Sequence, residues 1–139
     1  MFYGAEGVIV PMPIACGAAM SKILIADDDE MNRDVLSRRL HRHGYEVAVA
    51  CDGEEVVAMA SSETPDLILM DLSMPVLNGW QATEKIKSNP ATQHIPVLAF
   101  TSHKINGEDA MMAGFDGYAL KPVELDSLLA QMEKLLGGA

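Results

Sequence analysis

The chain has 139 residues, of which 20 are acidic and 10 are lysine or arginine, so its formal net charge is −10 at pH 7. A chain of this length forms one domain that buries roughly 68–70% of its unfolded surface, which leaves no room for a second folded unit. The acidic balance excludes a surface that binds nucleic acid through phosphate contacts, and we expect protein partners instead.

The two cysteines, Cys16 and Cys51, lie far apart in the sequence and form no metal-ligand or redox pattern. This arrangement argues against a zinc site and is typical of free thiols in a reducing compartment. We therefore expect a cytoplasmic protein.

The first 20 residues are mildly apolar, but Pro11 and Pro13 interrupt them and they contain no lysine or arginine. The segment is too short and broken for a membrane span, and it lacks the basic start of a secretory signal. We expect residues 1–20 to be an N-terminal extension outside the fold, with Met20 as the natural start and a single domain over residues 21–139.

From residue 22 onward, short apolar runs alternate with segments of helical periodicity. In chain order we predict a strand at 23–26, a helix at about 31–43, a strand at 45–50, a helix at 53–62, a strand at 66–70, a helix at about 80–87, a strand at 97–100, a brief helix at 108–113, a strand at 117–120 and a helix at 123–136. Glycine, proline and asparagine residues mark most of the boundaries. This α/β alternation over short connections predicts a parallel sheet with helices on both faces and right-handed crossovers.

The strands differ in how much of their surface the sequence predicts to be buried. Residues 45–50 alternate between polar and apolar side chains, as expected of an edge strand with a half-exposed face. Residues 66–70 form a continuous apolar run, as expected of a central strand covered on both faces. Asp71 follows this run, and a carboxylate at the end of a buried strand has to be neutralised or used for chemistry.

Polar groups follow four of the five predicted strands. They are the run Asp27-Asp28-Asp29, then Asp71, Thr101 and Lys121. The carboxyl ends of parallel strands meet at one edge of a sheet, where ligands bind in open α/β folds. Carboxylates gathered there repel one another unless a cation balances them, and hard oxygen ligands with room for water favour Mg²⁺. The acidic loop after the first strand argues against a nucleotide site, which needs backbone N–H groups facing phosphate.

The chain resembles the receiver domain of bacterial two-component response regulators over residues 22–136. The resemblance is carried by four motifs in order, ILIADDDEMNR, LILMDLSMP, VLAFTSH and GYALKP. It implies a flavodoxin-like, doubly wound (βα)5 three-layer sandwich of CheY-like type, with a parallel five-stranded sheet in the order 2-1-3-4-5. It also implies a stand-alone phosphoacceptor of a phosphorelay, rather than a turnover enzyme.

The resemblance further implies a role for each matching residue. Asp71 would be the nucleophile and the modified residue. Mg²⁺ would be bound by Asp71, by Asp28 directly, by Asp27 mainly through water and by the backbone carbonyl of Ser73. Lys121 and the Thr101 hydroxyl would contact the phosphoryl oxygens, and movement of Thr101 would be coupled to inward rotation of Tyr118. The donor would be a sensor histidine kinase or a histidine phosphotransfer protein, and the output a downstream protein target.

The same residues also have simpler structural interpretations. Asp27 and Asp28 are possible N-caps of the first helix, although Asp29 or Glu30 can fill that role. Asp71 can be a turn carboxylate, Thr101 a strand end, Lys121 a surface lysine, and Tyr118 a half-buried strand residue. The arginines of the first helix, Arg38, Arg39 and Arg42, are either a solvated face or a docking surface for the phosphodonor.

Two other functions stay open on the sequence alone. A pseudo-receiver would bind partners without being phosphorylated. A small phosphatase of the haloacid-dehalogenase type also uses a nucleophilic Asp and Mg²⁺, but its D-x-D-x-T/V motif requires Thr or Val where this chain has Met31.

Overall fold

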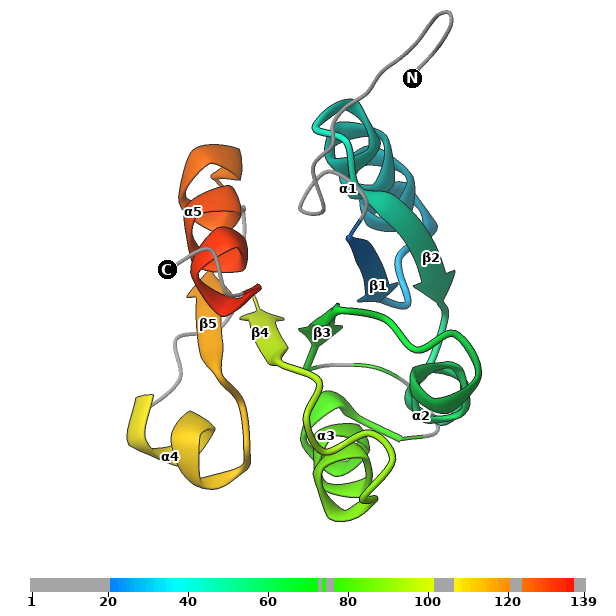
Figure 1. Ribbon diagram of the computed structural model, residues 1–139, viewed down its shortest axis with the longest axis vertical. Coiled ribbons are helices and arrows are strands. Elements are labelled where there is room, and N and C mark those ends of the chain that lie inside the picture. Colours follow the sequence, from blue (N-terminus) through cyan, green and yellow to red (C-terminus); the bar gives the residue numbers. More distant parts are fainter. Residues whose placement is uncertain (1–20, 73, 75–76, 102–106, 121–123, 137–139) are drawn as a thin grey trace, which may run out of the picture.

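The computed structural model describes residues 21–72, 74, 77–101, 107–120 and 124–136. These residues form five strands that alternate with five helices (Figure 1). The strands are β1 (Lys22–Ala26), β2 (Glu46–Ala50), β3 (Leu67–Asp71), β4 (Val97–Thr101) and β5 (Gly117–Leu120). The helices are α1 (Glu30–Arg42), α2 (Gly53–Ser62), α3 (Gly79–Ser88), α4 (Gly107–Met112) and α5 (Leu125–Leu135). The predicted extension at residues 1–20 lies outside the described residues.

All the strands are parallel, and their order in the sheet is β2-β1-β3-β4-β5. This confirms the predicted fold class and strand order. In the register, Ala26 of β1 lies opposite Met70 of β3, so the next residues along, Asp27 and Asp71, emerge side by side. The carboxyl end of β4, at Thr101, lies on the other side of β3.

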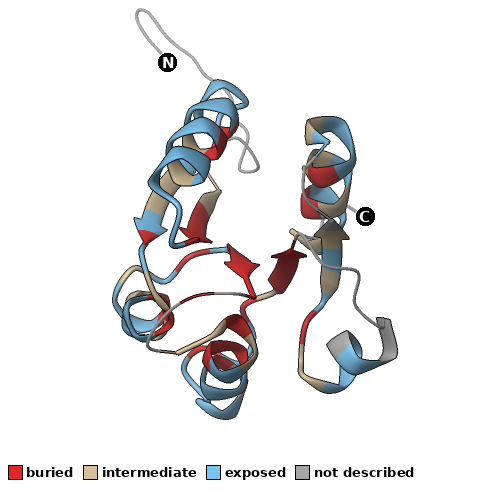
Figure 2. Ribbon diagram, turned by 180° about the vertical axis from the view of Figure 1, so that it is seen from behind, coloured by how far each residue is buried: buried red, intermediate tan, exposed pale blue. Residues whose placement is uncertain are grey.

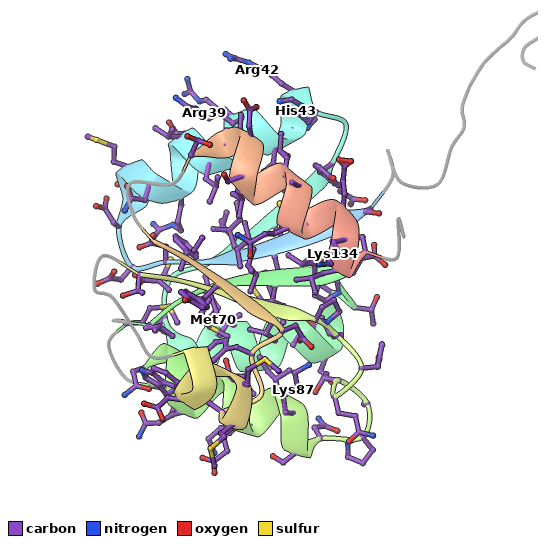
Figure 3. The ribbon with its side chains drawn as sticks, turned by 90° about the vertical axis from the view of Figure 1, so that its left-hand side faces the viewer. Arg39, Arg42, His43, Met70, Lys87 and Lys134 are labelled. Carbon is purple, nitrogen blue, oxygen red and sulfur yellow. The ribbon has the colours of Figure 1, made fainter. Side chains whose placement is uncertain are left out.

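The helices form two layers with the sheet between them. Helices α1 and α5 cover one face, and α2 and α3 cover the other (Figure 3). Strand side chains alternate between the two faces, so that Ile23 and Ile25 pack with α1 and α5 while Leu24 and Ala26 pack with α2 and α3. Each fully buried Ile or Leu contributes about 1.5–3 kcal/mol relative to an exposed one, which makes the two interiors the main source of stability.

Burial follows the position of each strand in the sheet (Figure 2). Every residue of β3 and β4 is buried, whereas β2 is exposed at Glu46 and Val49. The continuous apolar run and the alternating run were therefore correct predictors of a central strand and an edge strand.

Three helices begin at a capping side chain that the chain supplies immediately before them. Asp29 accepts hydrogen bonds from the backbone N–H groups of Met31 and Asn32, Asp52 accepts one from Glu55, and Asn78 forms a capping box with Gln81. Asp29 is thus the cap of α1, and the two aspartates before it are not needed for that purpose.

Candidate functional site

Three carboxylates come together at the carboxyl edge of the sheet. Asp27 and Asp28 follow β1, and Asp71 ends β3. One carboxylate oxygen from each residue lies within 4.8 Å of the others. In the described part of the chain, no other group of three or more His, Cys, Asp or Glu side chains is close enough together to hold a metal ion. Asp27 is 0% exposed and Asp71 is 4% exposed, whereas Asp28 is open to solvent.

This arrangement fits a small divalent cation. Two buried carboxylates beside a third repel one another in a medium of low dielectric, so their charged forms are costly without a counter-charge. Oxygens bound to one Mg²⁺ lie about 3–4 Å apart, because each sits about 2.1 Å from the ion. The observed spacing requires only a small adjustment to reach that geometry. The solvent-facing Asp28 leaves room for the waters that Mg²⁺ retains.

The turn after β1 is held by hydrogen bonds from several directions. The Asp27 N–H donates to the carbonyl of Ala50 at 3.2 Å, and Asp27 Oδ1 accepts from the Asp29 N–H at 2.9 Å. The Arg33 guanidinium donates through Nη1 to the Asp27 carbonyl at 2.7 Å. Arg33 was missed by the sequence reasoning, which considered only the arginines further along the helix. Its place one turn into α1, directly after the acidic run, was the available signal.

Two glycines allow close approach of the backbone, one of them at the end of β3. A Cβ atom on Gly79 would collide with the carbonyl oxygen of Asp71 and the Cα of Leu72, and one on Gly53 would collide with the backbone of Leu77. The Gly79 N–H also donates to the Leu72 carbonyl at 3.1 Å. The start of α3 is therefore packed directly against the main chain that carries Asp71.

The remaining predicted site residues fall into two groups. Thr101 is the buried last residue of β4, and Tyr118 lies in β5 with 39% of its surface exposed. Lys121 and Ser73 lie outside the described residues, so their predicted contacts are not described. Leu120, the last residue of β5, pairs with Thr101.

Comparison with known proteins decides the family. The sequence profile of the response regulator receiver domain matches residues 23–133. The chain belongs to this family. It is therefore a receiver domain of two-component signalling, as its resemblance predicted.

Curated relatives include a protein that the match covers completely and a much longer one. The receiver domain is 38% identical over 122 residues to protein PilH of Pseudomonas aeruginosa, a match that covers 86% of this chain and 100% of PilH. It is 35% identical over 117 residues to the response regulator PleD of Caulobacter vibrioides, where it covers 83% of this chain. The chain spans only 26% of the length of PleD.

Solved structures show the same fold. One is the receiver domain of the sensor histidine kinase PA1611 from Pseudomonas aeruginosa, which has a magnesium ion coordinated in its active-site cleft. It is 30% identical to this chain with a TM-score of 0.78, and the match covers 85% of this chain and 98% of that one. The chemotaxis protein CheY4 of Vibrio cholerae is 29% identical with a TM-score of 0.78, covering 84% and 98%. Among the described residues, no helix is both long and apolar enough to cross a membrane.

Proposed function

We propose that this receiver domain is a Mg²⁺-dependent phosphoacceptor that takes a phosphoryl group from a phosphohistidine onto Asp71. The observation that carries the proposal is the cluster of Asp27, Asp28 and Asp71 within 4.8 Å at the edge of the sheet. A carboxylate oxygen of Asp71 attacks the phosphorus, the P–N bond breaks, and the imidazole leaves as the neutral base after taking up a proton. The product is an aspartyl phosphate.

The other residues of the site bind and orient the transferring group. In the proposal Asp28 and Asp71 bind the cation directly, Asp27 binds it mainly through water, and the Ser73 carbonyl completes the protein ligands. Bound Mg²⁺ supplies positive charge that offsets the phosphoryl oxygens in the transition state. Lys121 binds another phosphoryl oxygen, and the Thr101 hydroxyl donates to a third. Catalysis then consists of positioning and electrostatics, which requires no general base.

We infer that the phosphorylated state is a signal and not a step in a turnover reaction. The same site hydrolyses its aspartyl phosphate slowly, and movement of Thr101 draws Tyr118 inward from its exposed position. Moving a two-state equilibrium from 1:99 to 99:1 needs about 5.5 kcal/mol, whereas a hydrogen bond to a charged group supplies roughly 1.5–3 kcal/mol. The summed free energy of two such contacts, from Thr101 and Lys121, barely reaches about 5.5 kcal/mol. A downstream protein therefore completes the switch.

The proposed phosphodonor is a sensor histidine kinase or a histidine phosphotransfer protein in the cytoplasm. Helix α1, which begins beside the acidic cluster, exposes 73% of Met31 and 45% of Val35. Arg39 and Arg42 project from the same helix, away from the sheet (Figure 3). The exposed apolar side chains next to the site suit contact with a partner helix that carries the phosphohistidine, and the arginines in the last turn of α1 offer cations further along the same helix.

Incubation with acetyl phosphate and Mg²⁺, followed by intact mass measurement, tests the proposal. The wild-type chain is expected to gain the mass of one phosphoryl group and to lose it slowly after the donor is removed. Asp71→Asn is expected to gain nothing, whereas Asp109→Asn, an exposed aspartate of α4, is expected to behave as wild type. A wild-type chain that stays unmodified indicates a pseudo-receiver, and rapid turnover of added phosphate esters indicates a phosphatase. Either result contradicts the proposal.

A further inference from the structure

We propose that Arg33 is a positioning residue that holds the acidic turn after β1 in the geometry that binds the cation, an inference that rests on the proposed function. Arg33 is half-buried, and its Nη1 donates to the carbonyl oxygen of Asp27 at 2.7 Å, six residues back along the chain. Its own backbone N–H donates to the Asp29 carbonyl at 3.0 Å in the first turn of α1. One residue therefore joins the rigid helix to the turn at two points.

The consequence is greatest for Asp28, the solvent-exposed member of the cluster. Its backbone lies between two fixed points, the Asp27 carbonyl held by Arg33 and the Asp29 N–H held by Asp27 Oδ1. The direction of the Asp28 carboxylate depends on these two peptide groups. Without the guanidinium, the peptide between Asp27 and Asp28 loses the hydrogen bond from Arg33 and is held less firmly.

Two physical effects of Arg33 on cation binding have opposite signs. As a permanent positive charge near three carboxylates, the guanidinium repels Mg²⁺, so its removal would tighten binding. As a hydrogen-bond donor that fixes the turn, it orients the ligands, so its removal would weaken binding. The 2.7 Å hydrogen bond goes to the backbone carbonyl of Asp27, so it fixes the turn that carries the carboxylates. We therefore expect the orienting effect to be larger than the repulsion. The sign of the change in affinity decides between them.

The test is a calorimetric titration of the full chain with Mg²⁺ alone. Arg33→Met is expected to weaken Mg²⁺ binding about tenfold, as is typical when a group that orients a metal ligand is removed. Arg33→Gln, a more polar neutral replacement, is expected to weaken it by a similar factor, and Arg33→Lys is expected to recover part of the loss. Arg38→Met is the matched control, because it removes the same charge from the same helix at an exposed side chain that pairs with Asp34, one turn back along α1.

Thermal unfolding in EDTA first establishes which variants are folded. Mg²⁺ binding that is unchanged or tighter in a folded Arg33→Met or Arg33→Gln variant overturns the inference. A loss in Arg38→Met as large as that in Arg33→Met also overturns it, since the effect would then be one of net charge. If the wild-type chain itself binds no Mg²⁺, the proposed function has failed, and that result is distinct from a failure of the Arg33 inference.

Discussion

Two buried threonines on and beside α3 differ in whether their hydroxyls are satisfied. Thr83 is 0% exposed, and its Oγ1 is the one buried side-chain polar atom among the described residues without a hydrogen-bond partner. Thr92 is 2% exposed, and its Oγ1 donates to the Ile86 carbonyl at 2.7 Å. A buried hydroxyl without a partner is destabilising, whereas one with a partner is stabilising.

The same substitution should therefore have opposite effects at the two positions. Thr83→Val replaces an unsatisfied hydroxyl with a methyl group and is expected to raise the free energy of unfolding by about 1 kcal/mol. Thr92→Val removes a hydrogen bond and is expected to lower it by about 1 kcal/mol. Urea unfolding of the two variants measures both values. A destabilised Thr83→Val would mean that its hydroxyl has a partner in solution.

Tyr45 gives the folded chain a dependence on alkaline pH. Burial, and then the nearby Glu133 carboxylate, raise the pKa of the Tyr45 phenol above its usual value. A group whose pKa is raised by folding contributes to stability. The contribution is complete at pH values below the pKa of the unfolded chain, about 10, and it is lost as the pH rises through the pKa of the folded chain. The hydrogen bond from Lys22 to Glu63 raises the pKa of the Lys22 ammonium group. The stability that this pair contributes is therefore also lost as the pH rises.

Tyr45→Phe should reduce this alkaline loss of stability. The wild-type chain is expected to become less stable as the pH rises above about 10, and the variant is expected to show a shallower decline over the same range, with the Lys22 component retained. Chemical unfolding at a series of pH values provides the measurement. Equal slopes in the two proteins would show that the phenol stays solvated.

At the level of the elements, the start of α3 packs directly against the Asp71 main chain. Gly79→Ala is expected to lower the free energy of unfolding by about 1–3 kcal/mol, because its new Cβ meets the Asp71 carbonyl and the Leu72 backbone, which cannot move without displacing the proposed phosphoacceptor. Acetyl phosphate should then modify this variant more slowly than wild type.

Gly117→Ala is the matched comparison for this prediction. Its Cβ meets the flexible ends of the Leu98 and Gln131 side chains, which can shift. We expect a smaller loss of stability and an unchanged rate of phosphorylation, both measured beside Gly79→Ala. Equal rates in the two variants would show that the packing of Gly79 does not position Asp71.

The elements themselves were largely predictable from the sequence. Apolar or alternating runs located the strands, since burial on two faces leaves a continuous apolar signature and burial on one face leaves an alternating one. Boundaries were less predictable, as β3 includes Asp71 and α3 begins at Gly79. In both cases the hydrogen bonds extend the element through a residue whose type does not favour it. The left-handed backbone of Thr64, with φ of 44°, was also not predictable, because a β-branched residue disfavours that region.

The candidate site was predictable to the extent that topology alone brings residues together. Parallel strands in this order place Asp27 beside Asp71 whatever the details of packing, and the structure brings them together with Asp28. The position of Arg33 early in α1 was a signal that it lies near the turn, but its contact with the Asp27 carbonyl depends on the angle at which α1 leaves the turn. That angle is a property of the packed helix and not of sequence spacing.

For the whole molecule, the net charge of −10 and the acidic cluster make cation binding a source of stability. A ligand that binds only the folded chain stabilises it by about 2.7 kcal/mol at a free concentration of 100 times its Kd. Mg²⁺ is therefore expected to raise the Tm of the wild-type chain more than NaCl of equal ionic strength, which only screens repulsion. The additional rise in Tm with Mg²⁺ should disappear in Asp28→Asn. An equal shift in both salts would argue against a specific site.

The proposed function depends above all on the carboxylate at the end of β3 as the acceptor of the phosphoryl group. The most direct measurement supplies a phosphorylated histidine phosphotransfer protein and Mg²⁺, traps the product by borohydride reduction, and locates the modified residue by peptide mass spectrometry. Asp71 is expected to be recovered as homoserine in the wild-type chain, and no homoserine is expected when EDTA replaces Mg²⁺. Modification at any other aspartate, or transfer that proceeds equally well in EDTA, would contradict it.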